Sequence, residues 1–321
     1  MKTVEKIIFN DKEYDKLYQG YDLLFEVNKE LDYLNFTALE PSTILYKPYT
    51  VTTAQYSFDK VSWETADNVT LNLNKGDKVY FKGNITNHQD FISYAKFTMT
   101  GKIAASGSIM SLQAGNPEDN SINYSGEFNC LFENCTSLVS APKLPATTLT
   151  QDCYFSMFSG CTSLKTAPTL PATTLAYHCY SNMFSGCTNL INVPELAATT
   201  LAERCCSFMF SGCTSLVKAP ELKATTLVDY CYSSMFENCT SLTTVPSLPA
   251  TTLSDSCYSS MFENCVNLKY IKCDVDYYRS YCFDNWLKNV AHTGDFYCYD
   301  ASIFPTGVNG IPEGWTVHSE I

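Results

Sequence analysis

The sequence predicts an α/β solenoid, a stack of six 26-residue coils of strand, loop and helix, preceded by a small antiparallel β domain. Three observations predict this fold. Residues 161–186, "CTSLKTAPTLPATTLAYHCYSNMFSG", and the next 26 residues, "CTNLINVPELAATTLAERCCSFMFSG", carry Cys, Leu, Pro and Met-Phe at the same positions. Apolar residues within each repeat are spaced as on one face of a helix. The residues before the repeats instead alternate between apolar and polar.

The composition supports a well-packed core and an acidic surface. Of 321 residues, 45% are hydrophobic and 14% are aromatic, which is ample for a core. The formal net charge is -12, and such a surface repels nucleic-acid phosphates and anionic lipids. No run approaches the roughly 20 apolar residues of a membrane helix. We therefore expect no nucleic-acid partner, no membrane insertion and no secretory signal within this sequence.

The chain before the repeats divides into two expected parts. Residues 31–127 contain alternating runs such as residues 68–84, "NVTLNLNKGDKVYFKGN", in which "NKGD" predicts a hairpin turn. We expect an antiparallel β domain there, resembling a small sandwich. Residues 1–30 are expected to be an anchoring segment. Within them, "VEKIIFNDKEYDKLYQGYDLLFE" resembles the short N-terminal segments of phage tail-associated proteins from gut bacteria.

The 26-residue period predicts that one supersecondary unit is stacked on itself, because a single unit cannot bury its apolar face alone. The solenoid is expected over residues 128–321, with a degenerate C-terminal cap from about residue 282. In the cap, "CFDNWLKNV" realigns on the last full repeat after a one-residue deletion, so that Cys282 and Trp286 match Cys257 and Met261. The six coils begin at Cys135, Cys161, Cys187, Cys213, Cys239 and Cys265.

Each coil is expected to contain one helix. In "TTLAERCCSFMF", Leu201, Cys205 and Met209 fall on one helical face, and Thr200 with Glu203 forms a capping box at the start. The residue before each of the six coil-starting cysteines is always Gly or Asn, the two residues that best tolerate the left-handed conformation at a helix end. These residues are Asn134, Gly160, Gly186, Gly212, Asn238 and Asn264.

The segment between the cysteine and the helix is expected to be a short strand. In "SLKTAPTLP", Leu164, Ala167 and Leu170 are apolar, but Ala167 differs in parity from the other two, so a flat strand cannot turn all three inward. We expect a kink at Pro168, which also lacks a backbone donor. The strands should stack in parallel at about 4.8 Å per coil.

Most of the 16 cysteines follow the repeat, which favours reduced, buried core residues. A second ladder follows the coil-starting cysteines by 18 residues and comprises Cys153, Cys179, Cys205, Cys231 and Cys257. The cysteines Cys130, Cys273, Cys282 and Cys298 lie outside both ladders and are the better candidates for disulfides. No C-x-x-C pair occurs and the four histidines do not follow the period, so neither a metal site nor a cofactor is expected.

The pattern "GCTSL…P…L…CY…MF" resembles the BspA-type leucine-rich repeat, the family named from Bacteroides surface protein A. In that family "AF-sGC-tsL" recurs in coils of about 23 residues; here Met-Phe replaces Ala-Phe and the coil is three residues longer. The resemblance covers about residues 128–315. It implies a leucine-rich-repeat fold and an adhesive role on a cell surface or after secretion.

No catalytic residue is expected, and the protein is predicted not to be an enzyme. The sequence lacks a nucleophile elbow, a phosphate-binding glycine loop and metal-ligand spacing. His178 lies beside Cys179, but adjacent side chains on a helix point about 100° apart and cannot act on each other.

Two polar columns vary freely between coils while the apolar and capping positions are kept. Such columns beside a stacked strand are how solenoids usually present a binding surface. The alternative is that these residues are only solvated and that the repeats are a structural spacer. The first column is Ser140, Thr166, Asn192, Lys218 and Thr244, and the second is Lys143, Thr169, Glu195, Glu221 and Ser247.

Together, these features predict a non-enzymatic recognition or adhesion protein, a tail-associated or receptor-binding component of a phage or a bacterial surface adhesin. The expected partner is a protein or glycan on a cell surface. Residues 1–127 would join the repeats to a homo-oligomer or a virion. The expected location is the virion or the extracellular cell surface.

Overall fold

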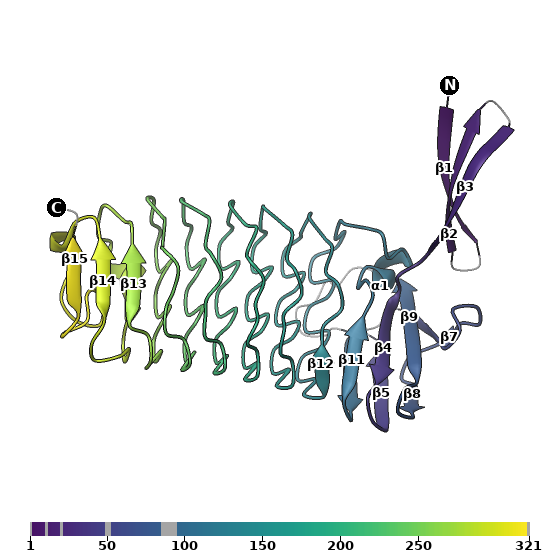
Figure 1. Ribbon diagram of the computed structural model, residues 1–321, viewed down its shortest axis with the longest axis horizontal. Coiled ribbons are helices and arrows are strands. Elements are labelled where there is room, and N and C mark those ends of the chain that lie inside the picture. The colour runs from purple at the N-terminus through teal and green to yellow at the C-terminus, as the bar shows by residue number, and fades with distance from the viewer. Residues whose placement is uncertain (1, 10–11, 20–21, 49–52, 85–94, 320–321) are drawn as a thin grey trace.

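The computed structural model describes residues 2–9, 12–19, 22–48, 53–84 and 95–319. Strands β1 (Lys2–Phe9), β2 (Lys12–Gln19) and β3 (Asp22–Glu30) form an antiparallel sheet of their own. A β domain follows, then a stack of coils, and a small parallel sheet ends the chain (Figure 1). The N-terminal β domain and the C-terminal sheet thus lie at opposite ends of the stack.

The β domain contains two sheets. The strands are β4 (Leu34–Ala38), β5 (Ser42–Lys47), β6 (Thr53–Ser57), β7 (Glu64–Thr65), β8 (Thr70–Leu73), β9 (Lys78–Asn84), β10 (Lys96–Thr100) and β11 (Ile103–Ser106). One sheet has the order β10-β5-β8. The other has the order β12-β11-β4-β9-β6-β7, in which β12 (Leu138–Ser140) comes from the first coil. The pairs among β4–β11 are antiparallel, as the alternating sequence predicts.

The expected hairpin at "NKGD" is wrong. The turn itself forms, with Gly76 at φ 95° and the Asp77 amide donating to the Asn74 carbonyl at 3.1 Å. However, β8 before the turn pairs with β5, whereas β9 after it pairs with β4 and β6. The turn therefore carries the chain from one sheet to the other, because both sheets need an apolar strand to cover the shared core.

The core of the β domain continues into the repeats without a break. Phe36, Phe81 and Phe97 are buried together, and the Phe97 ring stacks on Phe132 at 5.3 Å between centroids. Strand β12 (Leu138–Ser140), in the first coil, pairs in parallel with β11. The β domain therefore covers the open end of the first coil, and the sheet and the core both cross the expected boundary at residue 127.

The coils stack in parallel and in register, as the period predicts. Isolated backbone bridges join residues 26 positions apart, such as Thr166 with Asn192, Leu170 with Leu196 and Thr174 with Thr200. Among the described residues, named strands occur in the repeats only at β12 and at β13 (Tyr270–Cys273). In the middle coils that the structure describes, the short strand expected in each coil is reduced to single backbone bridges.

The helix expected in each coil is wrong, and so is the helical part of the predicted α/β class. Residues 151–160 and their equivalents every 26 residues, here called turn segments, form consecutive turns. Every fourth residue has positive φ, as at Asp152 (54°), Ser156 (50°) and Gly160 (72°). Left-handed residues at this spacing interrupt an α-helix. In the parts of the chain that the structure describes, the α-helix is α1 (Ser111–Ala114), which lies outside the coils.

The turn segments divide their hydrogen bonds between their own coil and the next. The Phe155 amide donates to the Asp152 carbonyl three residues earlier at 3.1 Å, while the Tyr154 amide donates to the Cys179 carbonyl of the next coil at 3.1 Å. The hydrogen bonds to the next coil could not form if the segment were an α-helix, because a helix satisfies its backbone amides within the helix itself. Thr200, expected to cap a helix, instead forms a backbone bridge with Thr174.

The left-handed conformation predicted before each coil-starting cysteine is confirmed. Gly160, Gly186 and Gly212 have φ of 72°, 72° and 73°, and Asn134, Asn238 and Asn264 have φ of 59°, 61° and 64°. These residues end a turn segment instead of a helix. A β-branched residue is the least compatible with this position.

The core of the stack is built from ladders of identical side chains. One phenylalanine in each coil stacks on its neighbours with ring centroids 5.4–5.7 Å apart, through Phe132, Phe158, Phe184, Phe210, Phe236 and Phe262. The coil-starting cysteines are buried, and the Cys161 thiol donates to the Phe132 carbonyl at 3.1 Å. Burial raises the pKa of Cys187 to about 12. Cysteine suits this position because it is small and supplies a weak donor.

The expectation of reduced ladder cysteines holds except at Cys257, which forms a disulfide with Cys282. The other fourteen cysteines are free and buried. Cys282 was a candidate for a disulfide, but its partner in the ladder was not. The Cα atoms of the pair are 5.1 Å apart, within the range that a disulfide requires.

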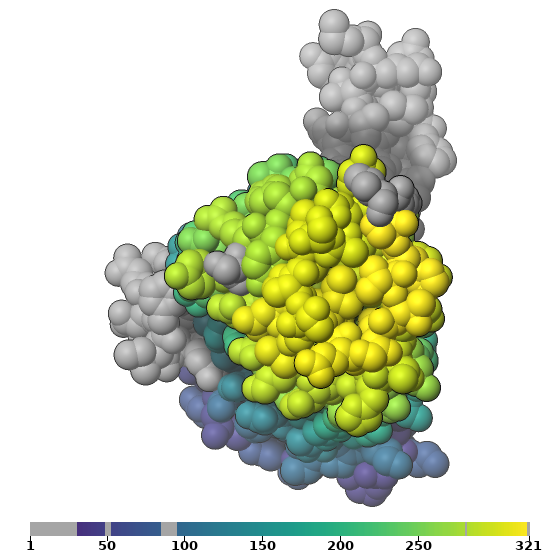
Figure 2. Space-filling model, turned by 90° about the vertical axis from the view of Figure 1, so that its left-hand side faces the viewer, coloured from purple at the N-terminus to yellow at the C-terminus, as the bar shows by residue number. Residues whose placement is uncertain are grey.

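The C-terminal cap closes the stack with aromatic side chains and a parallel sheet. It contains η1 (Ser280–Phe283), β14 (Asp295–Cys298), η2 (Ala301–Ile303) and β15 (Thr316–Ser319), and β14 pairs with β13 and β15. The Phe262 amide donates to the Trp286 carbonyl at 2.9 Å, which confirms the alignment after a one-residue deletion. Seen from this end, residues near the C-terminus cover the stack (Figure 2).

Stability is expected to fall with rising pH because of Glu127, at the start of the stack. The side chain is 2% exposed, and its burial raises the pKa of the carboxyl from its ordinary value of 4.5 to about 8. The folded state thus holds a proton that the unfolded state releases above pH 4.5, so stability is lost between about pH 4.5 and 8. Glu127→Gln should remove this loss, which is on the order of a few kcal/mol. Urea unfolding across that range, with Glu195→Gln as the exposed control, tests this; equal pH slopes for the wild type and Glu127→Gln would contradict it.

Candidate functional site

The ten predicted binding residues form one register-matched surface, here called the column surface. Thr166 bridges Asn192 and Lys218 bridges Thr244, so the first column follows the backbone pairing between coils. Of the ten, Ser140 and Ser247 are half-buried and the rest are exposed. The column surface comprises Ser140, Lys143, Thr166, Thr169, Asn192, Glu195, Lys218, Glu221, Thr244 and Ser247.

The two ends of the column surface also have structural contacts. Lys143 Nζ lies 2.6 Å from Asp32 Oδ2 of the β domain, and Ser140 Oγ donates to the Ala105 carbonyl at 2.9 Å. At the other end, Ser247 Oγ donates to Asp274 Oδ2 at 2.5 Å. The middle coils therefore carry the part of the surface that is most open to a partner.

Two apolar side chains that sequence reasoning missed lie beside the middle of the column surface. Ile191 and Val217 are 48% and 49% exposed and occupy equivalent positions of adjacent coils, next to Asn192 and Lys218. The equivalent position is Lys165 in the preceding coil and Thr243 in the following coil, so its residue type varies between coils. This variation could have identified the position from the sequence. Exposed aliphatic residues beside polar ones are typical of interaction surfaces.

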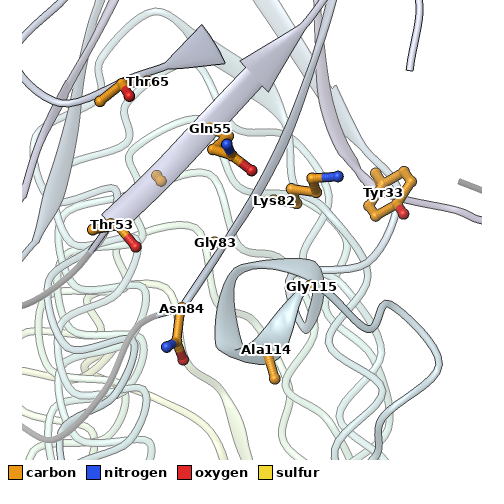
Figure 3. Close-up of a pocket in the computed structure, with 10 residues that line it drawn as sticks. Tyr33, Thr53, Gln55, Thr65, Lys82, Gly83, Asn84, Ala114 and Gly115 are labelled. Atoms are coloured by element: carbon orange, nitrogen blue, oxygen red, sulfur yellow. The ribbon is translucent and has the colours of Figure 1, made fainter. Parts of the chain in front are cut away.

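A pocket of about 710 Å³ lies in the β domain, between β6, β9 and the end of α1 (Figure 3). Its lining includes Thr53, Gln55 and Asn84, together with Lys82, whose ammonium group lies 4.0 Å from the Trp63 ring centroid. Among its described lining residues none is an acid, a histidine or a cysteine. This lining offers hydrogen-bonding groups without an acid-base pair. The pocket was not predicted from the sequence.

A second cavity, here called the turn pocket, lies across the first turn segments. It has a volume of about 410 Å³ and is lined by Asn129, Gln151, Asp152, Phe155, Tyr177 and His178. His178 Nδ1 lies 3.2 Å from Asp152 Oδ1. Burial lowers the pKa of His178, and the nearby Asp152 carboxylate partly opposes this effect. His178 is therefore neutral at neutral pH.

The structure separates His178 from Cys179, as expected. His178 lines the turn pocket, whereas Cys179 is 0% exposed and its burial raises the pKa of the thiol well above the ordinary value. A buried thiol of high pKa is a poor nucleophile. Sequence reasoning examined His178 only as a partner of Cys179 and missed its contact with Asp152.

Within the described ranges, no cluster of three or more His, Cys, Asp and Glu side chains is arranged to hold a metal ion. In the same residues, none of the helices has both the length and the apolar character needed to cross a bilayer.

Comparison with known families decides the type of repeat. The model of the BspA type leucine rich repeat region matches residues 127–219 and 195–292 in six copies, together more than half of the chain. The chain belongs to the BspA-type leucine-rich-repeat family. Six copies agree with the six coils predicted from the sequence. A search of curated proteins found no match, and neither did a search of solved structures. The resemblance of residues 4–26 to phage tail-associated proteins stays a prediction.

Proposed function

We propose that the protein is a non-enzymatic recognition protein and that the column surface binds its partner. BspA-type repeats are typically surface-associated repeats for protein binding and adhesion. The observation that supports the proposal is the contrast between the buried ladders, which repeat from coil to coil, and the exposed columns, which do not. The backbone pairing between coils places these varying, exposed side chains in line on one face, as in the binding surfaces of other solenoids.

The middle of the column surface combines charge, hydrogen-bonding groups and apolar contact. Glu195 Oε2 accepts a hydrogen bond from the Glu221 amide at 3.2 Å, which holds one acidic column in register. Lys218 supplies a cation in the neighbouring column, and Ile191 and Val217 add apolar area. This mixture suits a protein or glycan displayed on a cell surface. Residues 1–127 would attach the repeats to a bacterial surface or a virion.

A spacer is the second candidate, and one observation favours it. The phenylalanine ladder and the bonds between coils form a continuous stack with the β domain at one end and the cap at the other (Figure 1). Such a stack would hold the β domain away from a surface without binding anything itself.

Loss of binding in a column variant distinguishes the two candidates. Asn192, Glu195, Lys218 and Glu221 are replaced by Ala together, which leaves Lys143 and its contact with Asp32 intact. We expect binding to bacterial cells, matrix proteins or a glycan array to weaken at least about tenfold with little change in melting temperature. Glu203→Ala, on an exposed turn-segment residue of the same stack, is the control. Unchanged binding in the column variant would favour the spacer.

A further inference from the structure

The turn pocket is a built cavity outside the column surface. It is formed by three successive chain passes, which supply Asn129, then Gln151, Asp152 and Phe155, then Tyr177 and His178. The equivalent positions of later coils carry other residues, such as Glu203 and Arg204 in place of Tyr177 and His178. We propose that the turn pocket binds a neutral sugar residue. This proposal goes beyond the function assigned to the column surface and does not depend on it.

The polar groups of the pocket are fixed before any ligand binds. Asp152 is 4% exposed. Its Oδ2 accepts a hydrogen bond from Gln151 Nε2 at 2.9 Å, and its Oδ1 lies 3.2 Å from His178 Nδ1. Because Nδ1 faces the carboxylate, Nε2 of His178 is left as an acceptor for a hydroxyl group. The Asp152 and Gln151 side chains also retain lone pairs that hydroxyl groups can use. Vicinal hydroxyl groups are the natural partners for such an arrangement.

Asn129 adds an independent sign that the pocket is incomplete without a ligand. The residue is 9% exposed and lines the pocket, yet its amide oxygen accepts no hydrogen bond from the described part of the chain. A buried polar atom without a partner costs about 1–3 kcal/mol. A donor supplied by a ligand would recover this free energy, and a sugar hydroxyl is such a donor.

Aromatic rings supply the apolar part of the pocket. The Tyr177 ring stacks on the His178 ring with centroids 4.1 Å apart, and the Phe155 and His178 ring centroids are 6.0 Å apart. Tyr177 is 37% exposed, so part of its ring remains available for contact. A pyranose has an apolar C–H face and a polar rim, which matches rings beside amide and carboxylate groups. The volume of about 410 Å³ lies within the roughly 300–1,000 Å³ of small-molecule sites.

The local charges favour a neutral ligand. Asp152 is the one carboxylate among the six lining residues, and it already has two partners. A cation would therefore find no further carboxylate in the lining to pair with. An anion would be repelled by the buried Asp152 carboxylate. A polyhydroxylated neutral ring avoids both penalties.

Titration of the full-length protein with the methyl glycosides of glucose, galactose, mannose and N-acetylglucosamine tests the proposal. We expect at least one of them to bind with a dissociation constant of about 1 mM or tighter, as measured by calorimetry or ligand-observed NMR. Tyr177→Ala should weaken this binding about tenfold or more without a change in melting temperature, because the ring is partly exposed. Asp152→Asn should weaken it as well. Lys223→Ala, at an exposed position of a later coil outside the lining, should have no effect.

Several results would overturn the proposal. These are no detectable binding of any of the four glycosides, equal binding by the wild type and Tyr177→Ala, or preferential binding of n-butylammonium, which would make the pocket a cation site. If Asp152→Asn fails to fold, Tyr177→Ala still decides the outcome. The Asn192, Glu195, Lys218 and Glu221 column variant should retain glycoside binding, so failure of the turn pocket and failure of the column surface give different results.

Discussion

Phe210→Asp is expected to unfold the repeat stack. Phe210 is 0% exposed, and its ring lies between Phe184 and Phe236 at 5.6 Å from each. The substitution removes a ring from the middle of the ladder and buries a carboxylate without a cation, which should cost more than about 4 kcal/mol. Urea and thermal unfolding followed by circular dichroism would measure this loss. Because each coil stabilises its neighbours, the loss should spread to adjacent coils.

Glu195→Lys is the matched control for this prediction. Glu195 lies in the same coil and is exposed, so its reversal of charge should change the free energy of unfolding by no more than about 0.5 kcal/mol. Similar losses for Phe210→Asp and Glu195→Lys would mean that the buried and exposed faces of the coils are wrongly assigned.

Trp286→Ala is expected to have the next largest effect, because this side chain seals the last coil. Trp286 is 0% exposed, its indole donates to the Gly310 carbonyl at 3.0 Å, and its ring packs against Phe283 at 4.8 Å. Replacing a buried tryptophan by alanine costs about 3–5 kcal/mol and here leaves a cavity at the end of the core. Hydrogen exchange should show loss of protection beginning in β13 and β14 and extending toward the middle coils.

Tyr281→Ala provides the comparison within the same cap. Tyr281 is 65% exposed and lies near Trp286 in sequence, so its loss should leave the urea midpoint nearly unchanged. Protection lost first at the β domain end in Trp286→Ala would contradict the role of the cap.

The stack was predictable from the sequence because each buried ladder repeats its residue type every 26 positions. The helix was predicted wrongly because Cys205, Met209 and Cys213 recur every four residues, a spacing close to the 3.6 of a helix. The residues whose left-handed conformation interrupts the helix could be recognised from the sequence only where they are Gly or Asn. Others, such as Asp152 and Arg204, carry ordinary side chains at positive φ. Their left-handed conformation is imposed by hydrogen bonds to the next coil. The intrinsic conformational preference of a residue type carries no information about such bonds.

The column surface and the turn pocket also differ in how far they could be predicted from the sequence. The column surface was predictable, since its residues lie at fixed positions of the period and vary between coils. The turn pocket was not, because Asn129, Asp152 and His178 come from separate chain passes and meet only when the turn segments stack. The pocket in the β domain was not predictable either, because it depends on the order of the strands. The "NKGD" turn was wrongly predicted to form a hairpin, so that order was not known.

Recognition by the column surface can be measured by hydrogen exchange of the full-length protein. The exchange is compared with and without the matrix protein or arrayed glycan that binds most tightly. If the column surface carries recognition, amides of residues 190–196 and 216–221 in the middle coils should gain protection on binding. The equivalent turn-segment amides around Glu203 serve as the internal reference and should change little. Protection confined to residues 31–127, with none in the middle coils, would show that the β domain binds the partner and that the repeats are a spacer.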